Sequence, residues 1–296
     1  MAFIQVRDIE HYYEWIPAER TSENKPVMVF LHGWGGSSRY WNSTAEALSD
    51  SFDCLLYDMR GFGRSRAVSG TESPLVEYPP TTTAEFTYEM EEYAEDLAGL
   101  LDALNLQRVY INAHSMGASV ATFFLNLYPE RVEKAILTCS GIFEYDEKSF
   151  TTFHKFGGYV VKFRPRWLYQ LPYMDKMFMQ RFLHRSLPRD ISRAFLEDFL
   201  LADCNAALGT MVTSVSKKAA EVMPGEFAQI KVPTLLVAGE HDIIIPAAMG
   251  RQAASLNDFV EYFEIPDTAH FPMLEDAETY LRKVREFLGV KDLVSA

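Results

Sequence analysis

Ser115, Asp242 and His270 are of the residue types that together can make a hydroxyl nucleophilic. A serine hydroxyl attacks a carbonyl poorly unless a neighbouring base takes its proton, and histidine, with a pKa near neutrality, is the usual base. A carboxylate on the far side of the imidazole orients the ring and stabilises the imidazolium that forms. These residue types predict nucleophilic catalysis if the fold gathers all three at one edge of a sheet.

Ser115 lies at the centre of residues 113–117 (AHSMG), between the predicted strand residues 108–112 (RVYIN) and a helical pattern. A nucleophile at a sharp strand-to-helix turn needs small residues two positions before and two after it, and Ala113 and Gly117 meet that need. Alanine stands where glycine is commoner. Taken alone, the segment equally suits a serine that caps a helix, because serine is favoured at helix N-caps. Its position between a strand and a helix favours the nucleophile.

Residues 31–38 (LHGWGGSS) end a buried apolar run and contain three glycines. Glycine lets a backbone turn sharply and approach a ligand closely. We therefore expect the Trp34 N–H to point inward as one donor of an oxyanion hole, with Met116 N–H, at the start of the helix after the serine, as the other. His32 is predicted to be structural, packed beneath this loop.

Asp242 and His270 each follow a predicted strand. Asp242 lies in residues 239–246 (GEHDIIIP), where it could also cap a helix, and Glu240 is a weaker candidate for the same role. His270 is the one of the seven histidines that follows a carboxyl-edge acid and precedes the final helix. The chain order nucleophile, acid, base differs from the orders in chymotrypsin and subtilisin.

Short runs of β-branched and aromatic residues alternate with helical patterns along the chain. This alternation is typical of a mostly parallel sheet covered by helices. The predicted strands are 3–6, 11–16, 27–31, 53–58, 108–113, 135–140, 234–239 and 259–265, and the first two form an antiparallel hairpin. The predicted helices outside the cap are 39–50, 85–105, 116–128 and 277–288.

Between residues 142 and 224 the strand signals vanish, and aromatic, methionine and basic residues dominate. We predict a helical cap here (the cap segment, 142–224) and an α/β core formed by 1–141 and 225–296. The alternative is a second helical domain unrelated to the site. The position of the segment favours the cap, because it begins and ends at the carboxyl edge, where ligands bind open α/β sheets.

The chain of 296 residues has a formal net charge of −13. This charge disfavours binding to nucleic acid and to anionic membranes. No run approaches the ~18 apolar residues of a membrane-spanning helix, and the N-terminus lacks the pattern of a secretory signal. Cys54, Cys139 and Cys204 are predicted to be reduced core residues rather than a disulfide or zinc framework. We therefore expect a cytoplasmic location.

Five blocks, LHGWGG, DMRGFGRS, AHSMGAS, VPTLLVAGEHDIIIP and DTAHFP, occur in an order that resembles the α/β-hydrolase superfamily over nearly the whole chain. The resemblance implies an eight-stranded, mostly parallel sheet with a helical cap inserted after the sixth strand. It also implies that Asp58 and Arg60 tie a loop near the site.

The same resemblance implies a role for each candidate residue. Ser115 is the expected nucleophile, His270 the base and then the acid, and Asp242 the group that orients the histidine. Trp34 and Met116 are the expected oxyanion donors. A serine at the nucleophile position argues against the haloalkane-dehalogenase and epoxide-hydrolase branches, which form an ester on a carboxylate.

Among serine branches, the motifs resemble esterases, monoacylglycerol lipases and carbon–carbon bond hydrolases of ring-fission products. We expect hydrolysis of a carboxylic ester-type bond in a hydrophobic small molecule, without a metal or organic cofactor. The acidic, proline-rich stretch 71–83 is expected to border the site entrance. Three alternatives stay open: a carbon–carbon bond hydrolase, a cofactor-free lyase or oxygenase, and a slowly hydrolysing receptor. The oligomeric state stays open as well.

Overall fold

The computed structural model describes residues 2–17, 25–65 and 86–290. The stretch 71–83, expected at the site entrance, lies outside these residues. Within the described residues, no helix has both the length and the apolar character needed to cross a bilayer.

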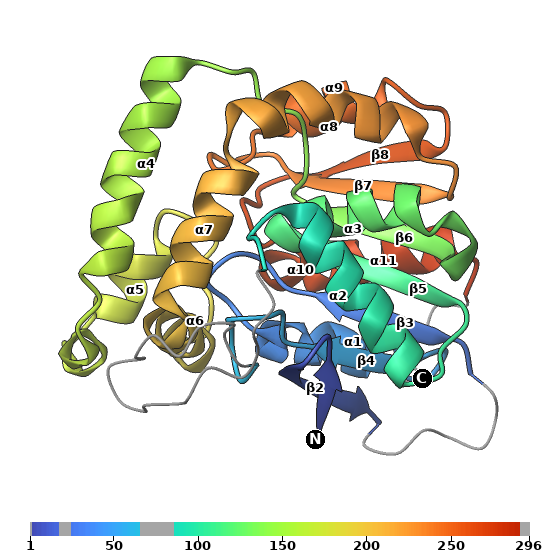
Figure 1. Ribbon diagram of the computed structural model, residues 1–296, viewed down its shortest axis with the longest axis horizontal. Coiled ribbons are helices and arrows are strands. Elements are labelled where there is room, and N and C mark those ends of the chain that lie inside the picture. Colours follow the sequence, from blue (N-terminus) through green and yellow to red (C-terminus); the bar gives the residue numbers. More distant parts are fainter. Residues whose placement is uncertain (1, 18–24, 66–85, 291–296) are drawn as a thin grey trace.

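Eight strands form one sheet in the order β1-β2-β4-β3-β5-β6-β7-β8 (Figure 1). The strands are β1 Ala2–Val6, β2 Ile9–Ile16, β3 Val27–Leu31, β4 Asp53–Tyr57, β5 Val109–His114, β6 Val132–Thr138, β7 Thr234–Gly239 and β8 Val260–Ile265. The pairs β1–β2 and β2–β4 are antiparallel, and all other pairs are parallel. The predicted fold class, an α/β fold with an eight-stranded and mostly parallel sheet, is confirmed.

Helices cover both faces of the sheet, which explains why the central strand β3 is apolar throughout. Successive side chains of a strand point to opposite faces, so Val29 and Leu31 of β3 pack in one cluster and Met28 and Phe30 in the other. The first cluster includes α2 (Met90–Ala103), α3 (Met116–Leu127), α8 (Lys217–Gln229) and α9 (Ala247–Ala254). The second includes α1 (Asn42–Leu48) and α11 (Ala277–Leu288).

The helix predicted over 85–105 begins later, at Met90. Glu89 is extended, with φ −72° and ψ 149°, and the carbonyl oxygen of Thr87 accepts hydrogen bonds from the Arg60 guanidinium at 3.3 Å. These hydrogen bonds hold the segment before Glu89 against Arg60, so the helix begins only at Met90. Sequence periodicity carries no information about such a contact.

The cap segment contains α4 (Glu147–Lys162), η3 (Arg166–Gln170), α5 (Met174–Met179), α6 (Arg189–Leu201), α7 (Cys204–Ser214) and the start of α8. Figure 1 shows α4 to α7 gathered beyond one end of the sheet. The boundary expected at 224 falls inside α8. The division into core and cap stays a prediction.

Helix α3 approaches β3 so closely that only glycine fits at one position. A Cβ added to Gly117 would lie 2.5 Å from the carbonyl oxygen of His32 and 2.9 Å from that of Leu31. Both neighbours are backbone atoms, which cannot move aside without shifting the strand end. The small residue that the sequence motif demands two positions after Ser115 is therefore a packing requirement.

Replacing Gly117 by alanine is expected to destabilise the fold by about 2–4 kcal/mol, because the new methyl group overlaps main-chain oxygens. Chemical denaturation followed by circular dichroism measures the change. Gly158→Ala is the control: a Cβ at Gly158 of α4 meets nothing within 4 Å. There the higher helix propensity of alanine should leave stability equal or raise it by up to ~1 kcal/mol. Equal stability of the two variants would contradict the argument.

Candidate active site

Ser115 forms the sharp turn between β5 and α3. Its backbone has φ 53° and ψ −120°, a positive φ that costs energy for any residue with a Cβ. Its amide donates to the Thr138 carbonyl oxygen at 2.9 Å, which ties the turn to the end of β6. This is the geometry expected of a nucleophile held at the carboxyl edge of the sheet.

The structure brings Ser115, His270 and Asp242 into one chain of hydrogen bonds. His270 Nε2 lies 3.0 Å from Ser115 Oγ, and His270 Nδ1 lies 2.7 Å from Asp242 Oδ2. Because an ionised carboxylate can only accept, Nδ1 carries a proton and donates to Asp242, and in the neutral ring Nε2 is then the acceptor that faces the serine hydroxyl. Glu240, the weaker alternative, instead accepts from the Asp267 amide at 3.0 Å.

Asp242 is held in its ionised form. Burial raises the pKa of this carboxyl, but the charge and hydrogen bond of His270 and the amides of Ile245 and Ile244 lower it, and the net pKa lies below its ordinary value. The two amides donate to Oδ1 at 3.1 and 2.8 Å, which leaves Oδ2 for the histidine. The two amides therefore fix the orientation of the Asp242 carboxylate, and the carboxylate in turn orients His270.

The two expected oxyanion donors come from the start of α3 and from the loop after β3. Met116 is the first residue of α3, and the first N–H groups of a helix have no acceptor within the helix. The loop that carries Trp34 runs against the serine, because a Cβ on Gly33 would lie 3.1 Å from Ser115 Cβ. The Trp34 indole donates to the Ala207 carbonyl oxygen of α7 at 2.9 Å. The role of the two amides as oxyanion donors stays a prediction.

His32 is fully buried and makes two hydrogen bonds to the main chain. Its Nδ1 bonds the Gly33 carbonyl oxygen at 2.8 Å, and its Nε2 accepts from the Met59 amide at 2.9 Å. Burial lowers the pKa of the ring, so it is neutral. These contacts agree with the structural role expected for His32.

Asp58 and Arg60 hold neighbouring loops, as the resemblance implies. Asp58 accepts from the Ser38 amide at 2.8 Å and from Arg64 Nε at 2.7 Å. Arg60 is fully buried and donates to Asp96 at 2.7 Å.

His114 and Tyr40 form a hydrogen-bonded path that sequence reasoning missed. The Gly33 amide donates to the Tyr40 hydroxyl at 2.5 Å, and that hydroxyl lies 2.9 Å from His114 Nδ1. His114 Nε2 lies 2.7 Å from the His270 carbonyl oxygen. Burial and, less strongly, the charge of His270 hold the pKa of His114 well below its usual range, so the neutral ring can accept at Nδ1 and donate at Nε2. The path joins the glycine-rich loop to the backbone of His270.

Glu275 was missed as well, although it follows His270 by five residues. It ends the short helix α10 (Pro272–Glu275) and is buried. Its Oε1 accepts from the amides of Ala269 and Phe271, at 2.9 and 3.3 Å. These amides flank His270, so one carboxylate oxygen fixes the backbone on both sides of the histidine.

The other oxygen of Glu275 binds the cap segment. Oε2 accepts from the amides of His184 and Arg185, each at 2.7 Å. The His270 amide itself donates to the Phe182 carbonyl oxygen at 2.9 Å. The loop that carries His270 is therefore bound to the cap as well as to the core.

Asp198 of α6 makes a second connection between the cap segment and the site. The side chain is almost fully buried, accepts from Ser37 Oγ at 2.6 Å and pairs with the Arg39 guanidinium. Burial raises the pKa of Asp198 to about 6, although Arg39 and Ser37 act in the opposite direction. Ser37 belongs to the glycine-rich segment 31–38, and Arg39 follows that segment directly.

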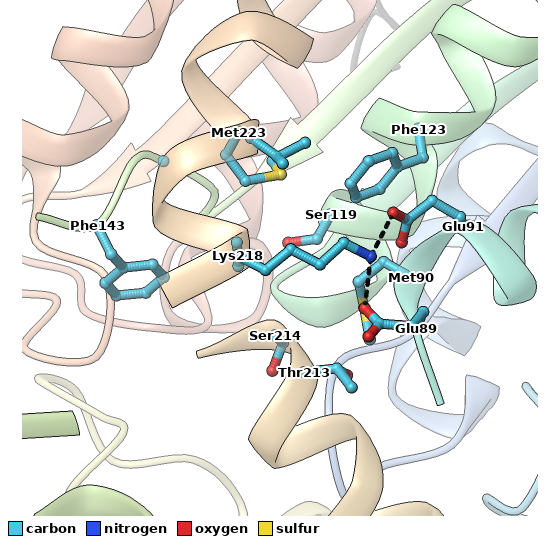
Figure 2. A pocket seen from close by; sticks show the side chains of 13 residues that line it. Glu89, Met90, Glu91, Ser119, Phe123, Phe143, Thr213, Ser214, Lys218 and Met223 are labelled. Carbon is cyan, nitrogen blue, oxygen red and sulfur yellow. Dashed lines mark hydrogen bonds and ion pairs between the residues drawn. The ribbon is translucent and has the colours of Figure 1, made fainter. Parts of the chain in front are cut away.

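Residues of α2, α3, α7 and α8 line a small pocket (Figure 2). Lys218 of α8 lines it and donates to Glu89 at 3.0 Å and to Glu91 at 2.9 Å. Its water-accessible space of about 20 Å³ suits little more than a water molecule. Ser119 lines it, one turn beyond Ser115, but no triad residue does. The two ion pairs of Lys218 therefore connect the start of α8 to the N-terminal end of α2 in the core.

Two groups within the described part of the chain have enough ligand atoms for a metal ion, all within 4.8 Å of one another. The groups are His114 with Cys139 and His270, and His184 with His241 and Asp267. Hydrogen bonds to Tyr40, Asp242 and Ser115 already use three ring nitrogens of the first group. The second is exposed, and its two imidazole rings stack at 4.2 Å instead of converging on one point.

Comparison with known proteins identifies the family. Residues 26–277 match the model of the alpha/beta hydrolase fold family. The chain is 24% identical to the "Putative carbamate hydrolase RutD" of Pseudomonas savastanoi pv. phaseolicola, over 90% of this chain and 95% of that protein. The enol-lactonase from Burkholderia xenovorans has a similar structure, with a TM-score of 0.75, 22% identity and coverage of 97% and 100% of the two chains. A thermophilic esterase from Thermogutta terrifontis gives a TM-score of 0.75, 21% identity and 98% coverage of both.

The chain therefore belongs to the α/β hydrolase family. It is a hydrolase.

The connection through Asp198 should make stability depend on pH in the mildly acidic range. Its folded-state pKa of about 6 lies above the unfolded value, so the protonated carboxyl stabilises the fold at low pH and this contribution is lost as pH rises through 6. From about pH 4 to about pH 7, wild type should lose up to about 3 kcal/mol relative to Asp198→Asn. Denaturant titrations of both proteins at several pH values measure the difference. Parallel stability curves would contradict the argument.

Proposed function

We propose that the protein is a serine hydrolase that cleaves a carboxylic ester-type bond through an acyl-enzyme on Ser115. One observation carries the proposal: the hydrogen-bonded series from Asp242 through His270 to Ser115, with distances of 2.7 and 3.0 Å. A serine in a strained turn, an imidazole whose Nε2 faces its hydroxyl and an ionised carboxylate behind the imidazole make up an activated nucleophile.

In the first step, Ser115 Oγ attacks the substrate carbonyl carbon while His270 Nε2 takes the hydroxyl proton. The carbonyl oxygen becomes negatively charged and accepts from the amides of Trp34 and Met116. When the tetrahedral intermediate collapses, His270 returns the proton to the leaving alcohol and Ser115 stays acylated. Water then gives a proton to His270 and attacks the acyl carbon, and release of the acid restores the serine hydroxyl. Asp242 keeps its charge throughout and stabilises the imidazolium.

An arc of aromatic rings from the cap segment supports an apolar substrate. Phe199 packs on Trp34 with ring centroids 5.7 Å apart, Phe178 stacks on Phe199 at 5.0 Å, and Phe182 follows at 5.8 Å. Phe182 in turn lies 6.1 Å from the His270 ring. The arc runs from the loop of one proposed oxyanion donor to the proposed base, so an apolar acyl or aryl group is the natural fit.

The relatives favour the same bond class. Their names describe a carbamate hydrolase, an enol-lactonase and an esterase. For each of these activities the bond broken joins a carbonyl carbon to a heteroatom. We propose an ester-type substrate for this chain on that ground and on the geometry of Ser115.

We also propose that residues 142–224 act as a cap over this site. Phe182 and the 184–185 amides hold the His270 loop, and Asp198 holds the loop after β3. The segment therefore supplies both apolar walls and contacts that position the catalytic loops.

The test combines covalent labelling with turnover. A fluorophosphonate probe should label Ser115 alone, and p-nitrophenyl esters with apolar acyl groups should be hydrolysed. Ser115→Ala and His270→Ala should abolish labelling, and Asp242→Asn should lower kcat/KM by about 10⁴-fold, because the imidazole would take the wrong tautomer. Ser119→Ala is the matched control: the same side chain one turn along α3, expected within about threefold of wild type.

Labelling at another residue would overturn the assignment of Ser115. Labelling at Ser115 without ester turnover would favour carbon–carbon bond hydrolysis or a slow receptor. Activity that survives Ser115→Ala would favour a lyase or oxygenase reaction.

A further inference from the structure

The outer face of α4 exposes large apolar side chains to solvent. We define this face by Phe153, Phe156, Tyr159, Val160 and Phe163, which follows the helix directly. Their spacing of three and four residues places them on one side of the helix. Phe156 is 71% exposed and Phe163 is 70% exposed. Soluble proteins rarely leave so much contiguous apolar area in water without a use for it.

The opposite side of α4 already has its packing partner. Phe150 and Val161 are buried there, and Gly157 lies so close to Met211 of α7 that a Cβ would meet its sulfur at 2.5 Å. His154 Nε2 bonds the Val215 carbonyl oxygen at 2.6 Å. The outer face is thus a second apolar face, and Figure 1 shows α4 at the edge of the molecule with α7 between it and the sheet.

Basic residues border the outer face in a regular row. Lys148, Lys155 and Lys162 recur every seven residues, so they line one edge of the helix beside Tyr159, and all three are exposed. Residues 148–181 contain seven Lys and Arg and a single acidic residue, a net charge of +6 in a chain whose net charge is −13. The only acid of this stretch, Asp175, is buried.

Further exposed side chains of this basic stretch are of the types that favour membrane interfaces. Trp167 and Tyr173 are both more than half exposed, and Met177 is equally accessible. Tryptophan and tyrosine place an apolar ring in lipid and a polar atom in water.

We propose that the outer face of α4 docks the cap onto an anionic lipid bilayer. An apolar face bordered by lysines is the pattern of helices that lie in the interface, with rings among the acyl chains and ammonium groups among the headgroups. A bilayer suits the observations better than a second copy of this chain, because the lysines that border the outer face in two copies would repel each other. The proposal does not rest on the proposed function.

The whole-chain charge does not oppose this docking. At physiological ionic strength the field of a charge decays over roughly 8 Å, so a bilayer responds to the charges that face it. Those charges are basic on the cap, and the acidic excess lies elsewhere in the chain. The expectation of repulsion from anionic membranes holds for the rest of the protein, not for this face.

The test is co-sedimentation of the full chain with vesicles. Vesicles of phosphatidylglycerol and phosphatidylcholine should bind the protein, vesicles of phosphatidylcholine alone should bind it at least tenfold more weakly, and added salt should reduce the binding to the anionic vesicles. Dibrominated acyl chains should quench the fluorescence of bound protein through Trp167, and Trp167→Phe should remove most of that quenching.

Two double variants separate the apolar and the electrostatic contributions. Phe156→Ser with Phe163→Ser, and Lys155→Glu with Lys162→Glu, should each weaken binding at least tenfold. Phe259→Ser and Lys231→Glu are the controls, because both side chains are exposed on the core, and their binding should stay within about twofold of wild type. Thermal unfolding checks that all variants are folded, which exposed positions should allow.

Three results would overturn the proposal. One is failure of wild type to bind anionic vesicles, and another is equal loss of binding in the control variants. The third is a concentration-dependent dimer that the phenylalanine variant abolishes, which would assign the face to a second copy.

Discussion

The positive φ of Ser115 is the constraint on which the site depends. A side chain in that conformation is held only where its surroundings leave no alternative. Here the Thr138 carbonyl oxygen fixes the Ser115 amide, and the strand end at Leu31 and His32 presses against Gly117. The same close approach brings the glycine-rich loop beside the hydroxyl. Tight packing of α3 on β3 therefore produces both the strained nucleophile and the nearness of the proposed oxyanion donors.

His270 depends on a different kind of support, since its loop has no regular secondary structure. The amides before and after it bind Glu275, its own amide binds Phe182, and its carbonyl oxygen binds His114. With these four main-chain groups engaged, only the side chain is left to move. This fixed backbone holds the imidazole where its Nε2 faces the Ser115 hydroxyl at 3.0 Å.

Much of this arrangement could be predicted because it depends on local sequence patterns. Apolar runs mark strands, and strand ends mark the sheet edge, so Ser115, Asp242 and His270 could be placed together before any coordinates. Glu275, His114 and Tyr40 could not, because they bind main-chain atoms that only the folded chain brings near. Asp198 was missed for the same reason: its partners Ser37 and Arg39 lie some 160 residues away.

Helix α7 connects the two surfaces on which the proposals rest. Met211 packs against Gly157 of α4, and the Ala207 carbonyl oxygen, one turn earlier, accepts from the Trp34 indole. The outer face of α4 and the loop beside Ser115 are thus joined by a single rigid element. A force that tilts α4 acts on α7, and a shift of α7 acts on the loop that carries a proposed oxyanion donor. Physical contact of this kind is the minimum that coupling between a docking face and a site requires. Here it consists of one packing contact, between Gly157 and Met211, and one hydrogen bond, between the Trp34 indole and Ala207.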